Sequence, residues 1–225
     1  SSTFSRQSLV GFPGASARAL VWAEKRLTAV KRFIHEKAAD LSALAITNLP
    51  VRRKITGEDE QKVALAFEWG PAVISHFGRI RGIDEWKDRQ VVIVIGREQP
   101  PPEEIETLAR GLYCDDREPL ALTGTYAKAL RGYRLKDGRR LGIEVDVHLE
   151  PRAQRILELK RERESVQAID RLRLVHCETP KVVLILCNLP LDIDVDRLVS
   201  WRDLANGGCR LDQALVGVEG VPAGE

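Results

Sequence analysis

Two short segments carry residue types that could act on a phosphate group. Gly82-Ile83-Asp84 lies in HFGRIRGIDEWKDRQVVIVIG, where a polar stretch leads into an apolar run. Gln167 and Arg171 are four residues apart in QAIDRLR, which places them on one face of a helix just before KVVLIL. A glycine allows close approach of the main chain, and a guanidinium group binds phosphate oxygens. The alternative for the first segment is a plain turn. The alternative for the second is a helix whose arginines, Arg173 included, form ordinary ion pairs with nearby acidic residues.

The elements that must position these segments indicate an α/β fold. The runs VVIVI and KVVLILC are apolar on both faces, which is typical of interior strands of a parallel sheet. We expect further strands at 41–47 and 72–77, helices at 15–39, 60–69, 103–113, 151–175 and 195–204, and a loop at Asn48-Leu49-Pro50. Asp137-Gly138 between alternating apolar residues predicts a β-hairpin. The fold class is therefore α/β, with a mainly parallel sheet flanked by helices and a β-hairpin insertion.

The same pattern divides the chain into three parts. We expect an N-terminal helical segment at 1–40, an α/β lobe at 41–205 with the hairpin insertion at about 114–150, and a loose tail at 206–225. The sequence contains no Met, even at position 1, so we also expect a fragment, a processed product, or a sequence from which residues have been omitted.

Several classes of protein are excluded by what the sequence lacks. There is no G-x-x-x-x-G-K-[ST], so the chain should not hydrolyse a nucleoside triphosphate alone. There is also no G-x-S-x-G or H-E-x-x-H, the motifs of serine hydrolases and zinc proteases. Four irregularly spaced cysteines argue against a zinc module and favour a reducing, cytoplasmic location. Acidic clusters at 115–116 and at 192, 194 and 196 are more typical of a surface than of a metal site. No run is long and apolar enough to span a membrane, so we expect no membrane partner.

The order of the two segments resembles motifs five and six of superfamily-two helicases. These motifs lie in the second, RecA-like lobe, and LAITNLPVRRK at 44–54 is similar to the opening motif of that lobe. The resemblance covers about 41–204 and is nearest to helicase-like proteins of phages and mobile elements. The usual sixth motif reads Q-x-x-G-R-x-x-R. Here Asp170 replaces the glycine, and the second arginine comes one position early, as Arg173.

The resemblance implies a P-loop NTPase fold and a share in ATP hydrolysis. ATP and Mg²⁺ would lie at the junction with a missing first lobe, which would carry the phosphate loop. Arg171 is the expected arginine finger, because a guanidinium from the facing lobe stabilises charge on the transferred phosphate. Arg173 would be the second catalytic arginine. Gln167 would position Arg171 or touch the γ-phosphate, Gly82 would let the main chain approach the nucleotide, and Asp84 would accept a ribose hydroxyl or an arginine.

Nucleic acid, with DNA favoured over RNA, is the second expected partner. The net charge of +2, from 35 basic and 33 acidic residues, does not indicate such a partner, so contact would need a local patch. One expected patch follows the first strand, at Thr47, Asn48, Arg52 and Arg53. The densest basic stretch surrounds the hairpin and comprises Arg131, Arg134, Lys136, Arg139 and Arg140.

We therefore expect the C-terminal lobe of an ATP-dependent helicase or translocase, inactive without its first lobe. One alternative is a non-catalytic nucleic-acid-binding or scaffold domain that kept the fold and lost the nucleotide site, which Asp170 would suit. A third is an unrelated α/β protein that binds a small ligand at the carboxyl ends of its strands.

Overall fold

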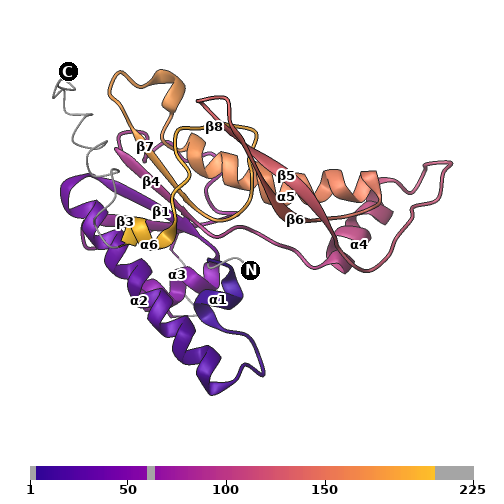
Figure 1. Cartoon of the computed structure of the whole chain (residues 1–225), viewed down its shortest axis with the longest axis horizontal. Helices are drawn as coiled ribbons and strands as arrows, with labels where there is room; N and C mark the ends of the chain where they lie inside the picture. Colours follow the sequence, from indigo (N-terminus) through magenta and orange to yellow (C-terminus); the bar gives the residue numbers. More distant parts are fainter. Residues whose placement is uncertain (1–3, 60–63, 206–225) are drawn as a thin grey trace.

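A five-stranded sheet forms the centre of the protein in a computed structural model that describes residues 4–59 and 64–205. Its strand order is β2-β3-β1-β4-β7 (Figure 1). The strands are β1 (Ala43–Thr47), β2 (Phe67–Trp69), β3 (Ala72–His76), β4 (Val91–Ile95) and β7 (Val182–Leu186). β3, β1, β4 and β7 run parallel, whereas β2 pairs antiparallel with β3. The prediction of a mixed α/β fold with a mainly parallel sheet flanked by helices is confirmed.

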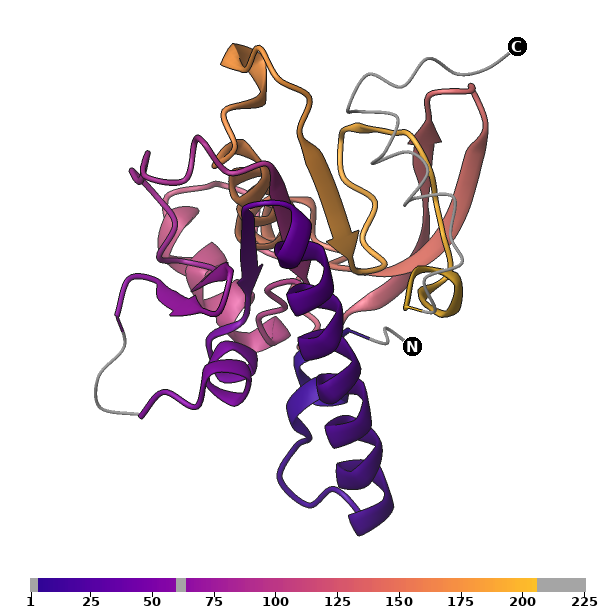
Figure 2. The ribbon, with the colours of Figure 1, turned by 90° about the vertical axis from the view of Figure 1, so that its left-hand side faces the viewer.

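Both faces of this sheet are covered, as the apolar strands predicted. In β4, Val91, Ile93 and Ile95 belong to one hydrophobic cluster and Val92 and Val94 to another. The first cluster includes side chains of α1 (Arg6–Val10), α2 (Ala17–Asp40), α3 (Leu49–Thr56) and α6 (Trp201–Ala205). The second includes the end of α5 (Pro151–Asp170) and the segment 77–86. Figure 2 shows α2, in indigo, lying along the sheet, so the N-terminal helical segment completes the core.

The hairpin forms a second, smaller sheet beside α5 (Figure 1). β5 (Ala127–Leu135) and β6 (Arg140–Val147) pair antiparallel, and β8 (Asp194–Val195) pairs parallel with the end of β5. Gly138 closes the turn with a φ of 85°, a left-handed conformation that glycine adopts without a steric penalty.

A buried polar cluster fastens the loop that precedes the hairpin to α4 (Pro102–Leu112). One carboxylate oxygen of Glu106 accepts hydrogen bonds from the main-chain N–H groups of Thr123 at 2.8 Å and Gly124 at 2.7 Å. The same oxygen lies 3.0 Å from Nε2 of His148. Because Nδ1 of His148 accepts from the N–H of Glu150, its Nε2 is the donor to Glu106. The hydrogen bond from Gly124, and then those from His148 and Thr123, lower the pKa of Glu106 although burial opposes them.

Four expected elements differ from the structure. The Asn48-Leu49-Pro50 segment opens helix α3 rather than a loop, because proline is tolerated in the first turn of a helix. In the expected helix 60–69, positions 60–63 lie outside the described residues and Phe67–Trp69 form β2. The expected helix 151–175 ends at Asp170, and the expected helix 195–204 is replaced by β8, an irregular stretch and α6. The expected loose tail at 206–225 lies outside the described residues.

Candidate functional site

The Gly82–Asp84 turn lies in the segment that connects β3 to β4. Gly82 has a φ of 71°, and a Cβ added there would meet nothing within 4 Å. Its glycine is therefore required by backbone conformation rather than by space. Ile83 packs against the second hydrophobic cluster, while Asp84 is exposed. The turn is thus anchored at its centre and open at its end.

Arg171 fastens this turn to the end of α5. Its Nη1 donates to the main-chain oxygen of Ile83 at 3.0 Å, and its Nε donates to the main-chain oxygen of Gln167 at 3.2 Å. The guanidinium is part-buried, and both of these acceptors are main-chain groups. The structure therefore gives Arg171 a positioning role in the fold of the turn.

Arg173 is the exposed arginine of the pair. Its guanidinium contacts the Asp84 carboxylate through Nε at 3.1 Å and also through Nη2, and 48% of its side chain is exposed. The hydrogen bond from Arg173 and the charge of Arg173 hold the pKa of Asp84 below its usual value. Exposed ion pairs of this kind are weak and exchange readily for another partner.

The main chain of Arg173 is also unusual. With φ 51° and ψ 48°, it is the one non-glycine residue with a positive φ in the part of the chain that the structure describes. The residue before it is held in place, since Leu172 is fully buried and its carbonyl accepts from Nζ of Lys181 at 2.8 Å. Backbone strain of this type costs about 1–3 kcal/mol and is concentrated at functional sites.

Two further residues complete the cluster. Nε of Arg81 lies 3.1 Å from Oε1 of Glu164 and 3.1 Å from Oε1 of Gln167, and Glu164 also accepts from the N–H of Gly78 at 3.3 Å. The side chain of Gln167 thus positions Arg81, and its carbonyl receives Arg171. Sequence reasoning missed Arg81 and Glu164, although Arg81 directly precedes the glycine of the turn. The structure brings Gly82, Asp84, Gln167, Arg171 and Arg173 together where the two segments meet.

The expected nucleic-acid contacts after β1 lie differently. Thr47 is fully buried, and its hydroxyl donates to the carbonyl of Ile95 at 2.9 Å. Asn48 is 5% exposed, and its Nδ2 donates to the carbonyl of Arg97 at 3.1 Å and to Glu98 at 2.9 Å. Both side chains connect strand ends inside the protein, so the structure corrects their expected place on a nucleic-acid-binding surface.

Arg52 requires the same correction. It is completely buried, with Nε 2.7 Å from Glu58 and Nη1 3.1 Å from the carbonyl of Leu65 and 3.0 Å from Nδ1 of His76. Helix α3 turns Arg52 into the core because it continues through this segment, where a loop was expected. Arg53, the next residue of that helix, is partly buried.

His76 is neutral in this arrangement. Burial, and then the charge of Arg52, lower the pKa of His76 to about 4. The geometry agrees, because Arg52 has only donors and Nδ1 of His76 must therefore accept.

The basic residues of the hairpin do not form one patch. Arg131 extends to α5, where its Nη2 lies 2.6 Å from Glu158. Arg134 and Lys136 meet the aspartates around β8, and Arg139 pairs with Asp137 in the turn at 2.7 Å. Arg140 is exposed and has no ion-pair partner among residues 4–59 and 64–205. The positive charge of the hairpin is thus largely matched by acidic residues of the same chain.

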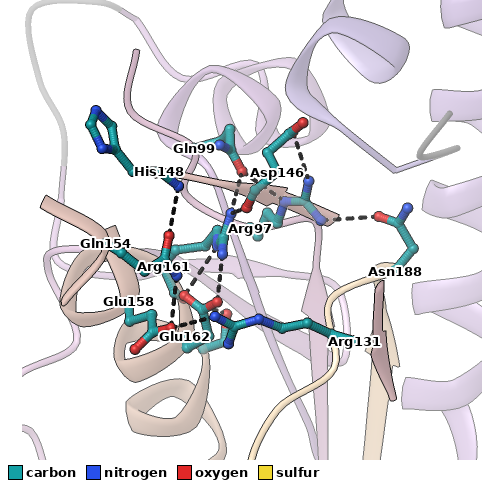
Figure 3. Close-up of polar contacts among 11 residues, drawn as sticks. Arg97, Gln99, Arg131, Asp146, His148, Gln154, Glu158, Arg161, Glu162 and Asn188 are labelled. Atoms are coloured by element: carbon teal, nitrogen blue, oxygen red, sulfur yellow. Dashed lines mark hydrogen bonds and ion pairs between the residues drawn. The ribbon is translucent and has the colours of Figure 1, made fainter. Parts of the chain in front are cut away.

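A second arginine cluster lies at the carboxyl ends of β4 and β7 (Figure 3). Nη1 of Arg97 donates to Asn188 at 3.1 Å, and Nη1 of Arg161 donates to the carbonyl of Asp146 at 2.8 Å. Arg161 is fully buried and pairs with Glu162 at 2.6 Å. Burial, and then the neighbouring charge of Arg161, lower the pKa of Arg97. These contacts fix the hairpin and α5 to the carboxyl ends of the strands. Open α/β proteins bind small ligands at this end of the sheet.

The acidic clusters considered for a cation differ in setting. The aspartates at 192, 194 and 196 pair with Arg134 and Lys136, and Asp116 pairs with Arg152 at 2.9 Å. Within the described ranges, no group of three His, Cys, Asp or Glu residues is placed to hold a metal ion.

Among the same residues, no helix has both the length and the apolar character needed to cross a bilayer.

Comparisons with known proteins identify no relative of this chain. Searches of protein-family models, curated proteins and solved structures find no match to the chain.

Proposed function

We propose that this chain is the second, RecA-like lobe of an ATP-dependent nucleic-acid helicase or translocase. One observation carries the proposal: two segments 88–89 residues apart meet through Arg171 and Ile83 and through Arg173 and Asp84. These are the segments whose order resembles helicase motifs, and a strained, exposed arginine stands at their junction. A cytoplasmic location belongs to the same proposal.

The geometry divides the work between the two arginines. Arg173 is the residue we propose to contact the phosphates, because it is exposed and the one side-chain partner it has among the described residues is an exposed carboxylate. Arg171 holds the turn that presents Asp84, which in turn orients Arg173. This reverses the expectation that Arg171 is the arginine finger. A preoriented guanidinium stabilises charge that develops on a transferred phosphate.

The residues present fit a shared nucleotide site. Arg173 offers a planar set of donors suited to phosphate oxygens, and Arg81 and Gln167 contact each other across the same two segments. ATP with Mg²⁺, bound by the first lobe, would supply the phosphoryl group. The hairpin, with nucleic acid as its partner and DNA favoured, would supply the second contact.

The test is ATP turnover by the parent polypeptide that contains both lobes, with and without single-stranded DNA. Arg173→Ala should lower DNA-stimulated turnover by about three to five orders of magnitude. Arg163→Ala is the matched control, because Arg163 is an exposed arginine of α5 without an ion-pair partner among the described residues. Equal turnover in the Arg173 and Arg163 variants would remove Arg173 from the mechanism.

A second candidate, a non-catalytic nucleic-acid-binding or scaffold domain, has one observation in its favour. Arg81, Arg171 and Arg173 all already have partners within the chain. A scaffold would bind DNA without ATP turnover in the wild-type parent protein, and these contacts would serve only to stabilise its fold.

A further inference from the structure

The edge of the hairpin sheet is covered by an acidic segment of the same chain, residues 192–196. β8, inside this segment, pairs with β5 at only two positions, Arg134 with Asp194 and Leu135 with Val195. One further hydrogen bond, from the N–H of Lys136 to the carbonyl of Val195, measures 3.1 Å. β5 and β6, by contrast, pair over eight positions. The acidic segment is therefore attached by few main-chain contacts.

The side chains of the acidic segment alternate. Ile193 and Val195 are half-buried, and Ile193 packs against the second hydrophobic cluster. The carboxylates of Asp192, Asp194 and Asp196 are 92%, 62% and 77% exposed. The segment thus presents a row of three exposed negative charges, as a nucleic-acid backbone does.

That row lies on the outward basic residues of β5 and its turn. Nη1 of Arg134 is 2.8 Å from Asp192, its Nε is 3.1 Å from Asp194, and Nζ of Lys136 is 2.6 Å from Asp196. The side chains of Arg134 and Lys136 are 50% and 62% exposed. Exposed ion pairs contribute little, so another anion can replace the aspartates at low cost.

The surroundings leave room for a polymer. A groove of about 2110 Å³ runs beside the acidic segment and is lined by residues of α1, β7 and the hairpin. Figure 2 shows the chain after β7, in orange to yellow, passing from the central sheet to the hairpin. Displacing the acidic segment, whose residues 193–196 form part of the groove wall, would therefore widen this groove and also uncover Arg134 and Lys136, which do not line it.

We infer that Arg134 and Lys136 form a binding surface for the phosphate backbone of a single nucleic-acid strand, and that the acidic segment occupies this surface until the strand displaces it. The inference rests on the proposed function, because it assumes a nucleic-acid partner. It adds the surface and a competitor built into the chain.

The experiment compares binding of a fluorescein-labelled oligothymidylate by the 225-residue chain at several salt concentrations. The test variant carries Asp192→Asn, Asp194→Asn and Asp196→Asn, and retains Ile193 and Val195. The control carries Asp40→Asn, Asp88→Asn and Asp115→Asn, three exposed aspartates on other elements. Both variants change the net charge by the same amount.

The test variant should bind about tenfold more tightly than the wild type, because the strand no longer has to break three ion pairs. Each such pair is worth a factor of about 1.4 to 5 in affinity. The slope of log K against log salt concentration should be steeper by about 1.4, which is about 0.7 for each of the two basic side chains that the aspartates no longer pair with. The control should change affinity by less than about twofold at 0.15 M salt, because distant charges are screened. Adding Arg134→Gln and Lys136→Gln to the test variant should cancel the gain.

The possible outcomes separate the two proposals. Equal binding by the test and control variants would overturn the inference and leave nucleic-acid binding itself in place. Absence of binding by every variant at low salt would reject the proposed function together with the inference. As a second readout, hydrogen exchange at the amide of Lys136 should accelerate when DNA is added, because the bond to Val195 is lost. Unchanged exchange during tight binding would also overturn the inference.

Discussion

Arg171 and Ile83 are 88 residues apart in the sequence, yet Nη1 of Arg171 donates to the main-chain oxygen of Ile83 at 3.0 Å. This contact makes the conformation of the Gly82–Asp84 turn depend on where α5 ends. It also gives neighbouring arginines different tasks, since Arg171 faces main-chain acceptors and Arg173 faces a carboxylate.

Arg171→Ala should destabilise the fold by about 2 kcal/mol, because it removes charge-assisted hydrogen bonds to two carbonyl groups. Urea unfolding followed by circular dichroism measures the change. Arg163→Ala, an exposed substitution on the same helix, should stay within about 0.5 kcal/mol of the wild type. Similar values for the two variants would show that Arg171 does not hold the turn.

Arg173→Gly should be more stable than Arg173→Ala by about 1 kcal/mol, since both lose the pair with Asp84 and only glycine relieves the left-handed backbone. Thermal unfolding of the two variants compares them directly. Both should lack DNA-stimulated turnover in the parent protein. If Arg173→Ala proves at least as stable as Arg173→Gly, the backbone at this position is not strained.

The free energy of unfolding should fall as the pH falls from about 6.5 to 4. His76 has a pKa of about 4 in the folded protein, so over this range the unfolded chain binds a proton that the folded protein does not. The slope contributed by one such group is at most about 1.4 kcal/mol per pH unit. His76→Asn keeps an acceptor for Arg52 without titrating in this range, and it should flatten the pH dependence measured by urea unfolding. An unchanged slope in this variant would place the titration elsewhere.

Glu106→Ala should cost about 2–4 kcal/mol, because the buried His148 and two part-buried main-chain N–H groups lose their acceptor. Glu106→Gln keeps an acceptor oxygen and should cost less. Hydrogen exchange at the amides of Thr123 and Gly124 should accelerate in the order wild type, Gln, Ala. Slow exchange in the Ala variant would mean that other contacts hold this loop.

Much of the fold follows from local pattern. VVIVI and KVVLILC predicted β4 and β7 because strands buried on both faces have no polar positions. The hairpin followed from Asp137-Gly138, because the turn needs a left-handed residue. The start of α3 was missed because an Asn-Leu-Pro sequence suits a loop and the first turn of a helix equally well.

The site was predictable in its residues and not in their roles. Glycine and aspartate marked the first segment, and glutamine and arginine marked the second. Sequence spacing, however, does not show which acceptor each arginine side chain contacts. The early end of α5 at Asp170 depends on the burial of Leu172 against distant residues, and it separates Arg173 from Arg171. The burial of Arg52 likewise depends on Glu58 and His76, which only the fold brings together.

Helix α5 connects the hairpin to the turn as a single rigid element. Glu158 holds Arg131 of the hairpin, and Arg171, at the end of the helix, holds Ile83. These positions are about 20 Å apart along the helix axis, and no glycine or proline lies between them. Such a helix resists bending, so it holds the hairpin and the Gly82–Asp84 turn at a fixed distance from each other.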